Sequence, residues 1–307
     1  MTVTVPNKDH GRYLPAALES ILAQDYPALE CIVVDAASTD GSLDILRAYE
    51  GRGVRWLSEP DSGPWEAIEK GWRLGRGEIL AWLNADDTWQ PGAVRAAVSY
   101  LETHPLVAVV HGDCGLIDED GKLVDLIRAR AWDTVRAVRE CDHILMQPAS
   151  FMRRSAVEAA GGLAQRWSHD QELWLRIALA GGRIEAISEH LGNTRIGDGH
   201  AHTIPGLILP ARLAMMDRLF ATPGLPAEIR AVERRALSNT YLRTIDPLKP
   251  KRLGDWRWAA RCLWGALRTD PANAPHIAGH VLRLAGARSP LGGRVAGALR
   301  RIAALRP

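Results

Sequence analysis

Short apolar runs alternate with amphipathic segments through the first third of the chain, and this alternation restricts the fold more than any other feature. The apolar runs predict strands at Val3 to Val5, Cys31 to Val34, Val54 to Leu57, Ile79 to Leu83 and Leu106 to Val110. The segments between them predict helices over Tyr13 to Gln24, from Ser42 onward, over Trp65 to Leu74, and from Pro91 to Leu101. Strand–helix alternation of this kind predicts an α/β fold with a mainly parallel sheet covered by helices on both faces.

Polar residues follow the predicted strands directly. They are Pro6 and Asn7, Asp35, Ser58 to Asp61, and Asn84 to Asp87. Because ligands of parallel sheets bind beyond the carboxyl ends of the strands, we expect these residues to converge on one edge and to form the site.

The remainder of the chain has a less regular pattern. Asp120-Gly121 predicts a hairpin turn, Gln147 to Met152 a strand, and Glu172 to Leu179 a helix. Beyond about Pro205 the sequence is rich in Ala, Leu and Arg with helical periodicity. We therefore expect two domains, residues 1–204 and a helical C-terminal region of residues 205–307.

Composition narrows the function classes. A formal net charge of +2 over 307 residues gives no reason to expect a nucleic-acid partner. The four cysteines are widely spaced, which favours reduced thiols rather than a zinc site or a disulfide framework. We find no signal peptide and no apolar stretch long enough to span a bilayer, and so predict a cytoplasmic protein.

The C-terminal tail is basic, since no acidic residue follows Asp270 while six arginines do. These helices could pack against the first domain or a second subunit, as in a homo-oligomer. They could instead rest on an anionic membrane at the inner membrane face. Both interpretations stay open.

The segment Asn84-Ala85-Asp86-Asp87 is the strongest single candidate for a functional site. Adjacent carboxylates after a buried strand are costly without a cation, and Mg²⁺ or Mn²⁺ takes one or two carboxylates together with substrate phosphates. Alternatively, Asp87 or Thr88 could cap the helix that follows Pro91.

Five other acidic residues are ambiguous in the same way. Asp35 is placed to accept hydrogen bonds from a nucleobase or ribose, whereas Asp40 fits a helix cap better. Asp61 fits either role, with capping slightly favoured. Asp170 and Glu172 begin a helix and point in different directions, so that one could face a cleft, although the helix dipole alone also explains acids there.

The order and spacing of these motifs resemble glycosyltransferase family 2, whose members have the GT-A fold. The resemblance covers about residues 1–200 and rests on Pro6-Asn7, Val33 to Gly41, Asp61-Ser62-Gly63, Gly77-Glu78-Ile79, Trp82 to Asp87, Gln147 to Phe151 and His169 to Arg176. It implies a Rossmann-like sheet and an inverting transfer from a nucleotide diphosphate sugar to an acceptor hydroxyl.

The resemblance also implies roles for single residues. Asp35 matches the base-binding aspartate, beside Pro6 and Asn7. Asn84-Ala85-Asp86 matches the family's DxD motif, so that Asp86 and Asp87 would contact Mn²⁺ or Mg²⁺ and the donor ribose. Asp170 matches the general base. The acceptor would be a hydroxyl, in some cases lipid-linked, in the synthesis of a bacterial cell-surface polysaccharide or glycolipid.

Some positions depart from the family pattern. Ala36 replaces a frequent second acid, and Glu66 and Glu69 stand where Asp and Asn are common. The family's metal-binding histidine is replaced by Gly197, so His200 or His202 would have to supply that ligand.

Tryptophans are numerous near the proposed cleft, and Trp89 or Trp167 could stack on an acceptor sugar, whereas Trp82 and Trp174 fit core packing. Two alternatives to a transferase remain. One is a degenerate, non-catalytic nucleotide-sugar binding protein. The other is a sugar-phosphate nucleotidyltransferase, although Asn7 to Arg12 make a poor phosphate loop. A dehydrogenase is disfavoured because GxGxxG is absent after the first strand.

Overall fold

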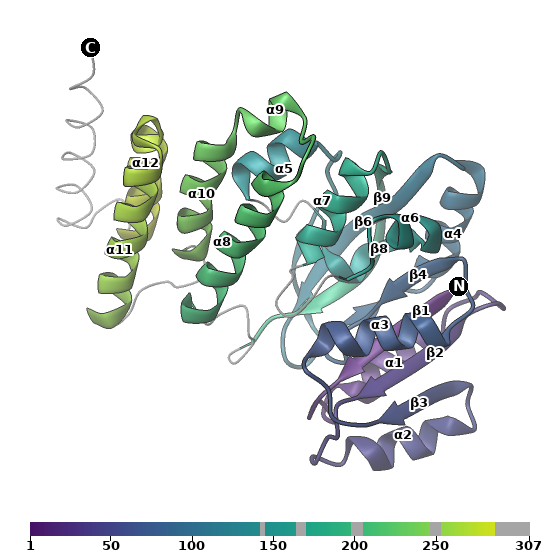
Figure 1. Cartoon of the computed structure of the whole chain (residues 1–307). Coiled ribbons are helices and arrows are strands. Elements are labelled where there is room, and N and C mark those ends of the chain that lie inside the picture. The colour runs from purple at the N-terminus through teal and green to yellow at the C-terminus, as the bar shows by residue number, and fades with distance from the viewer. Residues whose placement is uncertain (142–144, 164–169, 198–204, 246–252, 286–307) are drawn as a thin grey trace. The chain divides into compact units, whose positions relative to one another are not determined.

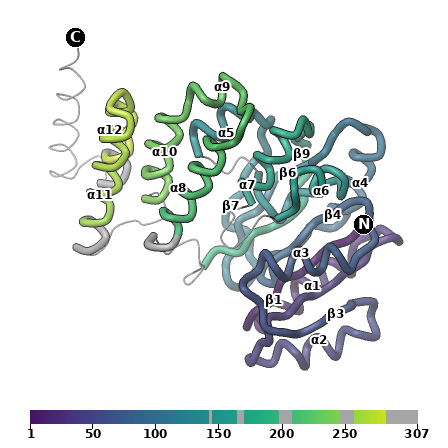
Figure 2. The backbone as a smooth tube through the Cα atoms, in the orientation of Figure 1, coloured from purple at the N-terminus to yellow at the C-terminus, as the bar shows by residue number. Residues whose placement is uncertain are grey.

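The computed structural model describes residues 1–141, 145–163, 170–197, 205–245 and 253–285. Contacts divide the chain into two compact units (Figures 1 and 2). The first holds Met1–Trp132 and His143–Gly197, and the second holds Asp133–Asp142 and Asp198–Pro307. The second unit therefore takes one short segment from the middle of the chain. The division at residues 204 and 205 stays a prediction.

One sheet organises the first unit. Among the described residues its strands run in the order β3-β2-β1-β4-β8-β6-β9-β5, and β7 pairs with β6 outside this path. Their bounds are β1 Thr2–Asn7, β2 Glu30–Asp35, β3 Val54–Ser58, β4 Ile79–Trp82, β5 Thr88–Trp89, β6 Val107–Ile117, β7 Leu123–Ile127, β8 Ser150–Arg153 and β9 Arg183–Arg195.

Helices cover this sheet as the alternating sequence predicts. Cys31 and Val33 of β2 join the core cluster that includes helix α1, whereas Ile32 and Val34 pack with Ala67 of helix α3. Alternate residues of a strand point to opposite faces, so α1 and α3 lie on opposite faces of the sheet. The helices of this unit are α1 Leu14–Leu22, α2 Ser42–Glu50, α3 Pro64–Leu74, α4 Ala93–Thr103, α6 Arg154–Ala159 and α7 Asp170–Leu179.

Strands β1 to β4 are mutually parallel where they pair. The register sets Asn7 opposite Asp35, and Asp35 opposite Ser58. Asn84 follows β4 by two residues. The expected convergence of polar residues on one sheet edge is thus confirmed for β1, β2 and β3, and parallel pairing carries β4 to the same edge.

The other half of the sheet is mixed. Strand β8 runs antiparallel to both β4 and β6, while β6 and β9 are parallel. The prediction of a strand over residues 147–152 is partly wrong, because Gln147–Ala149 forms a 3-10 helix (η1) and the strand begins at Ser150. The hairpin at Asp120-Gly121 is confirmed: β6 and β7 are antiparallel, and Gly121 has a φ of +83°.

Helices build the second unit. Leu209, Ile245 and Cys262 pack in one buried cluster, and Leu242, Ala266 and Ile277 in another. No helix within the described ranges is long and apolar enough to cross a membrane. The elements are α5 Thr134–Glu140, α8 Pro205–Ala221, α9 Ala227–Arg230, α10 Glu233–Ile245, α11 Leu253–Thr269, the 3-10 turn η4 Pro271–Asn273 and α12 Ala274–Ala285.

Candidate functional site

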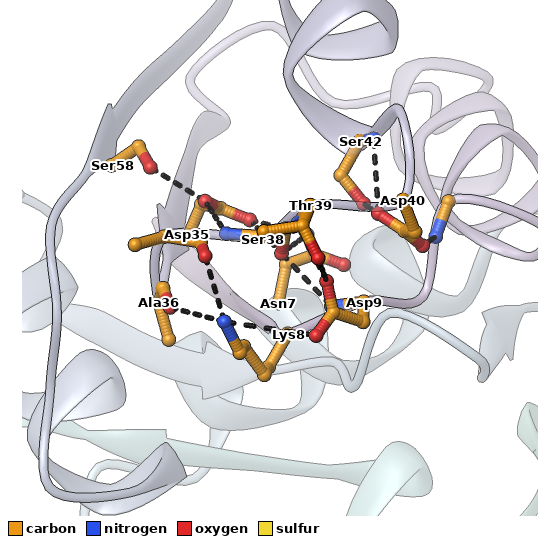
Figure 3. A network of polar contacts seen from close by, with 12 residues as sticks. Asn7, Lys8, Asp9, Asp35, Ala36, Ser38, Thr39, Asp40, Ser42 and Ser58 are labelled. Atoms are coloured by element: carbon orange, nitrogen blue, oxygen red, sulfur yellow. Dashed lines mark hydrogen bonds and ion pairs between the residues drawn. The ribbon is translucent and has the colours of Figure 1, made fainter.

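Asp35, at the end of β2, lies at the centre of a polar network (Figure 3). Its carboxylate accepts hydrogen bonds from Asn7 Nδ2 at 2.6 Å, from the Ser38 amide at 2.9 Å and hydroxyl at 2.5 Å, and from Ser58 Oγ at 2.6 Å. The residue is fully buried. Burial by itself raises the pKa of Asp35, but these hydrogen bonds together lower the pKa below its usual value. Asp35 is therefore an ionised and well-satisfied acceptor.

Asn7, at the end of β1, contributes a different feature. Its Nδ2 donates to Asp35 and also to Ser38 Oγ at 3.2 Å. Its Oδ1 is buried, and no described residue donates a hydrogen bond to it. Pro6 precedes it inside β1 and is also buried. The acceptor that remains available at this edge thus belongs to Asn7 rather than to Asp35.

Two loops are joined beside this network. Lys8 Nζ donates to the carbonyls of Ala36 at 2.8 Å and Ala37 at 2.7 Å, and Asp9 Oδ1 accepts from the Thr39 amide at 2.7 Å. Asp9 and Ala37 both have positive φ, 52° and 54°, a backbone region that costs energy for residues other than glycine. The contacts hold both loops in these conformations.

Asp40 and Asp61 make the local contacts of helix starts. Asp40 accepts from the Ser42 amide at 3.1 Å, where α2 begins, and from the Gly11 amide at 2.6 Å. Asp61 accepts from the Gly63 amide at 2.9 Å, just before α3, and burial, with a smaller effect of Glu66, raises the pKa of Asp61. The N-cap residues of these helices are Gly41 and Gly63, and neither has a side-chain cap hydrogen bond, so both aspartates close the turns that precede the helices. Donor binding by Asp61 stays a prediction.

The segment Asn84 to Asp87 follows β4 and is tied to distant parts of the first unit. Asn84 Nδ2 donates to Asp87 Oδ2 at 3.0 Å and to Gln147 Oε1 at 3.1 Å. The Arg195 amide donates to Asp87 Oδ1 at 2.9 Å, and Arg195 Nε donates to the Asp86 carbonyl at 2.9 Å. The side chain of Asp87 thus joins the β4 end to the end of β9.

Asp86 and Asp87 are both buried, and their charges interact. Burial first, and the Asp86 carboxylate second, raise the pKa of Asp87 to about 7, in spite of its hydrogen bonds. Two adjacent buried carboxylates, of which Asp86 disfavours the charged form of Asp87, fit a divalent cation, which needs only one or two protein carboxylates when phosphates supply the other oxygens. Within the described part of the chain, no group of three or more His, Cys, Asp or Glu side chains could hold a metal ion.

Asp170 is the first residue of α7, and its Oδ1 accepts from the Gln171 amide at 2.8 Å. Trp174 of the same helix stacks on Trp82, the last residue of β4, with ring centroids 5.6 Å apart. This stack attaches α7 to the strand that leads into Asn84. Both tryptophans are buried, as core packing predicts.

Trp89 is buried and does not offer its ring to an acceptor sugar. It is 3% exposed, packs on Phe151 and donates from Nε1 to the Pro148 carbonyl at 2.8 Å. That expectation was wrong because β5 pairs with β9 and places the ring in the core. His200, His202 and Trp167 lie outside the described residues.

Sequence reasoning assigned no role to two residues that organise this site. Arg195 contacts the Asp86–Asp87 segment, donates to the Asp118 carbonyl at 2.5 Å, and lies over the Tyr13 ring at 4.6 Å. Gln147 Nε2 donates to the Trp82 carbonyl at 2.5 Å. No local signal identified these two residues, because their partners lie 65 to 109 residues away in sequence.

The mixed α/β sheet, with paired carboxylates after the buried strand β4, can now be compared with known proteins. The family model "Glycosyl transferase family 2" matches residues 2–159. The chain belongs to this family.

Curated relatives match part of the chain. An uncharacterised glycosyltransferase, alr2836 of Nostoc sp. (strain PCC 7120), is 30% identical over 128 residues, which is 41% of this chain and 39% of the relative. TuaG of Bacillus subtilis (strain 168), named for teichuronic acid biosynthesis, is 31% identical over 105 residues, 33% of this chain and 41% of TuaG. The match thus spans about two-fifths of the length of these relatives.

Solved structures share the fold over nearly the whole chain. S. aureus TarS 1-349 in complex with UDP-GlcNAc matches with a TM-score of 0.66 at 17% identity, covering 99% of this chain and 90% of that one. The mannosyltransferase PcManGT from Pyrobaculum calidifontis, in complex with GDP-Man and Mn²⁺, matches with a TM-score of 0.62 at 21% identity, covering 99% and 85%. The fold is of the GT-A type.

Proposed function

We propose that this chain transfers a sugar from a nucleoside diphosphate sugar to an acceptor hydroxyl, with inversion at the anomeric carbon. The observation that carries the proposal is the buried Asp86–Asp87 pair at the carboxyl end of β4, in a chain of this family. Ligands bind at that edge of a parallel sheet. Two adjacent carboxylates, of which Asp87 has a raised pKa, suit a cation with its phosphates.

Asp86 is the better candidate for the cation, because it matches the last acid of the family's DxD motif. Both oxygens of Asp87 already accept hydrogen bonds from the Arg195 amide and Asn84, so Asp87 would orient the segment. When bound, Mn²⁺ or Mg²⁺ would neutralise charge on the leaving diphosphate, and His200 remains a candidate ligand. The Mn²⁺ in the mannosyltransferase complex supports a cation in this fold.

The nucleoside would lie at the ends of β1 and β2. Because the Asp35 oxygens already accept four hydrogen bonds, we propose that the buried Asn7 Oδ1 accepts from the base, while Asp35 orients Asn7. An imide N–H, as in uracil or thymine, is a donor of the required kind. The UDP-GlcNAc bound by TarS supports uridine, and GDP-Man in the mannosyltransferase keeps guanosine as an alternative.

Asp170 would act as the general base. It precedes Trp174 by four residues, so the two share a helix face about 6 Å apart along the axis, and Trp174 is fixed on the strand before Asn84. The Asp170 carboxylate takes the proton of the acceptor hydroxyl as its oxygen bonds to the anomeric carbon and the bond to the diphosphate breaks. One displacement inverts the centre. TuaG supports a cell-surface polysaccharide as the context.

The test combines one variant with a donor panel. UDP-, dTDP- and GDP-sugars are assayed with and without Mn²⁺, for binding and for transfer to an acceptor. Asp170→Asn is expected to keep donor affinity and to lose about 10²-fold or more in turnover, whereas the exposed Glu158→Gln control keeps wild-type turnover. Wild-type turnover of Asp170→Asn would reject its role. Donor binding without any transfer would identify a non-catalytic binding protein.

A further inference from the structure

The second unit contains a cavity of about 350 Å³, within the range of small-molecule pockets. Helices α5, α10 and α12, with the turn η4, supply the side chains that line it. Most of the residues that line it are polar, among them Arg139, Glu140, Arg235, Asn239, Arg243 and Asn273.

The charge of this lining is positive. Three arginines and one glutamate give a net +2 when the lining histidines are neutral. The net charge stays at +2 when the nearest ion-pair partners are included. Asp270 pairs with Arg235 at 2.6 Å and Arg136 pairs with Glu140 at 3.1 Å, so one negative and one positive charge are added. Two histidines, His276 and His280, share one face of α12 and add further donors. Such a lining suits an anion.

The arginines are held in place by the fold. Arg243 Nε donates to the Glu140 carbonyl at 3.2 Å, and Asn239 Nδ2 donates to the Arg139 carbonyl at 2.7 Å, so α10 satisfies the C-terminal end of α5. Arg235 is held by Asp270. An anion would therefore meet the guanidinium groups of Arg235 and Arg243 already held in position.

Asn273 adds an independent observation. It lines the cavity and is 1% exposed, and its Nδ2 donates to Ser238 Oγ at 2.9 Å and Asn239 Oδ1 at 2.8 Å. Its Oδ1 is buried and receives no hydrogen bond from the residues that the structure describes. A buried acceptor without a donor costs free energy. This atom therefore requires a donor, which an anionic group alone does not provide.

We propose that this cavity binds a polyol phosphate, a ligand that carries a phosphate and hydroxyl groups on one small molecule. The phosphate would pair with Arg139, Arg235 and Arg243. Hydroxyl groups would donate to Asn273 Oδ1 and to the Glu140 carboxylate. Such a group exists both as a free sugar or glycerol phosphate and as a lipid headgroup.

Calorimetry on the full chain tests the proposal with glucose 6-phosphate, sn-glycerol 3-phosphate, inorganic phosphate and glucose as probes. We expect saturable binding of the two polyol phosphates, tighter than that of inorganic phosphate or glucose. Arg235→Gln and the half-exposed Arg139→Gln should each weaken it about tenfold, the scale of one charge-assisted hydrogen bond. Arg234→Gln, a neighbour on α10 outside the lining, should change it less than about twofold.

Further measurements distinguish a lipid headgroup from a free metabolite and test whether the ligand binds in this cavity. Recruitment to phosphatidylcholine vesicles only when they contain phosphatidylglycerol, lost in Arg235→Gln, would support a headgroup, and binding of the free probes alone would support a metabolite. The proposal fails if no phosphate probe saturates, if Arg234→Gln weakens binding as much as Arg235→Gln, or if UDP or Asp86→Asn abolishes binding. If Arg235→Gln does not fold, exposed His276→Gln serves as the second lining variant, expected to weaken binding at least threefold.

Discussion

Asp35 and Asp87 are two buried carboxylates in the first unit, one at the end of β2 and the other in the segment after β4, and their pKa shifts are opposite. Hydrogen bonds from Asn7, Ser38 and Ser58 lower the pKa of Asp35 in spite of its burial. Burial and the neighbouring Asp86 raise the pKa of Asp87 to about 7. Both side chains are closed to solvent, yet their pKa shifts are opposite. At Asp35 the hydrogen bonds outweigh the effect of burial, whereas at Asp87 the deeper burial and the Asp86 charge outweigh the hydrogen bonds. Asp35 completes the fold, whereas the Asp86–Asp87 pair has negative charge that a ligand could neutralise.

The largest expected effect is on the charged pair. Asp86→Asn should lower kcat/KM for sugar transfer by about 10³-fold, on the scale of removing one main electrostatic contact in a transition state. Its melting temperature should equal or exceed that of the wild type, because relief of the repulsion favours the fold. Steady-state kinetics with Mn²⁺ and a thermal melt measure the two quantities. Unchanged kinetics would remove Asp86 from the site.

The complementary change at the other carboxylate should act on stability. Asp35→Ala leaves the donors of Asn7, Ser38 and Ser58 without their acceptor, and we expect a loss of about 3 kcal/mol in the free energy of unfolding. Urea denaturation measures it. A loss below about 1 kcal/mol would show that Asp35 is not a structural centre.

The two carboxylates should also give stability opposite pH dependences. A raised pKa means that the contribution of Asp87 is present at low pH and is lost as pH rises through about 7. Between pH 5 and 8 the loss is on the order of 2 kcal/mol without a divalent cation. Asp87→Asn should remove this pH dependence of stability.

The lowered pKa of Asp35 gives the opposite pH dependence. Its contribution to stability is kept at neutral pH and lost as pH falls through its folded pKa. Denaturation series at several pH values separate the two, and a flat wild-type profile from pH 5 to 8 would contradict the first.

The smallest expected effect concerns one donor of the Asp35 network. Ser58→Ala removes the hydrogen bond of 2.6 Å and should cost about 1 kcal/mol, because three other hydrogen bonds remain. Ser99→Ala, an exposed serine on α4, is the matched control and should be neutral. Equal stability of the two variants would mean that solvent replaces the Ser58 hydroxyl.

Much of the first unit could be predicted from the sequence because its signals are local. The apolar runs before Asn7, Asp35 and Asn84 identify strands, and parallel pairing then forces their ends together. The long strand β9 could not be predicted, since charged residues such as Glu185 and Glu189 interrupt its apolar pattern. The hydrogen bond between the Arg195 amide and Asp87 could not be predicted either, because that contact depends on where β9 ends. The roles of Asp86, Asp170 and Asn7 stay predictions.

The short helix α5 has a practical consequence for dividing this molecule. The chain enters the helical unit at Asp133, leaves it after Asp142 and returns at Asp198. Ala137 and Val138 of α5 are fully buried, and α5 packs on α10. A truncation at residue 204 would therefore expose these side chains on the remaining fragment and invite aggregation. If such a fragment is insoluble on expression, the cause would be the uncovered apolar side chains of α5 rather than an unstable sheet. Removing residues 133–142 together with the C-terminal region is therefore the better way to isolate the first unit.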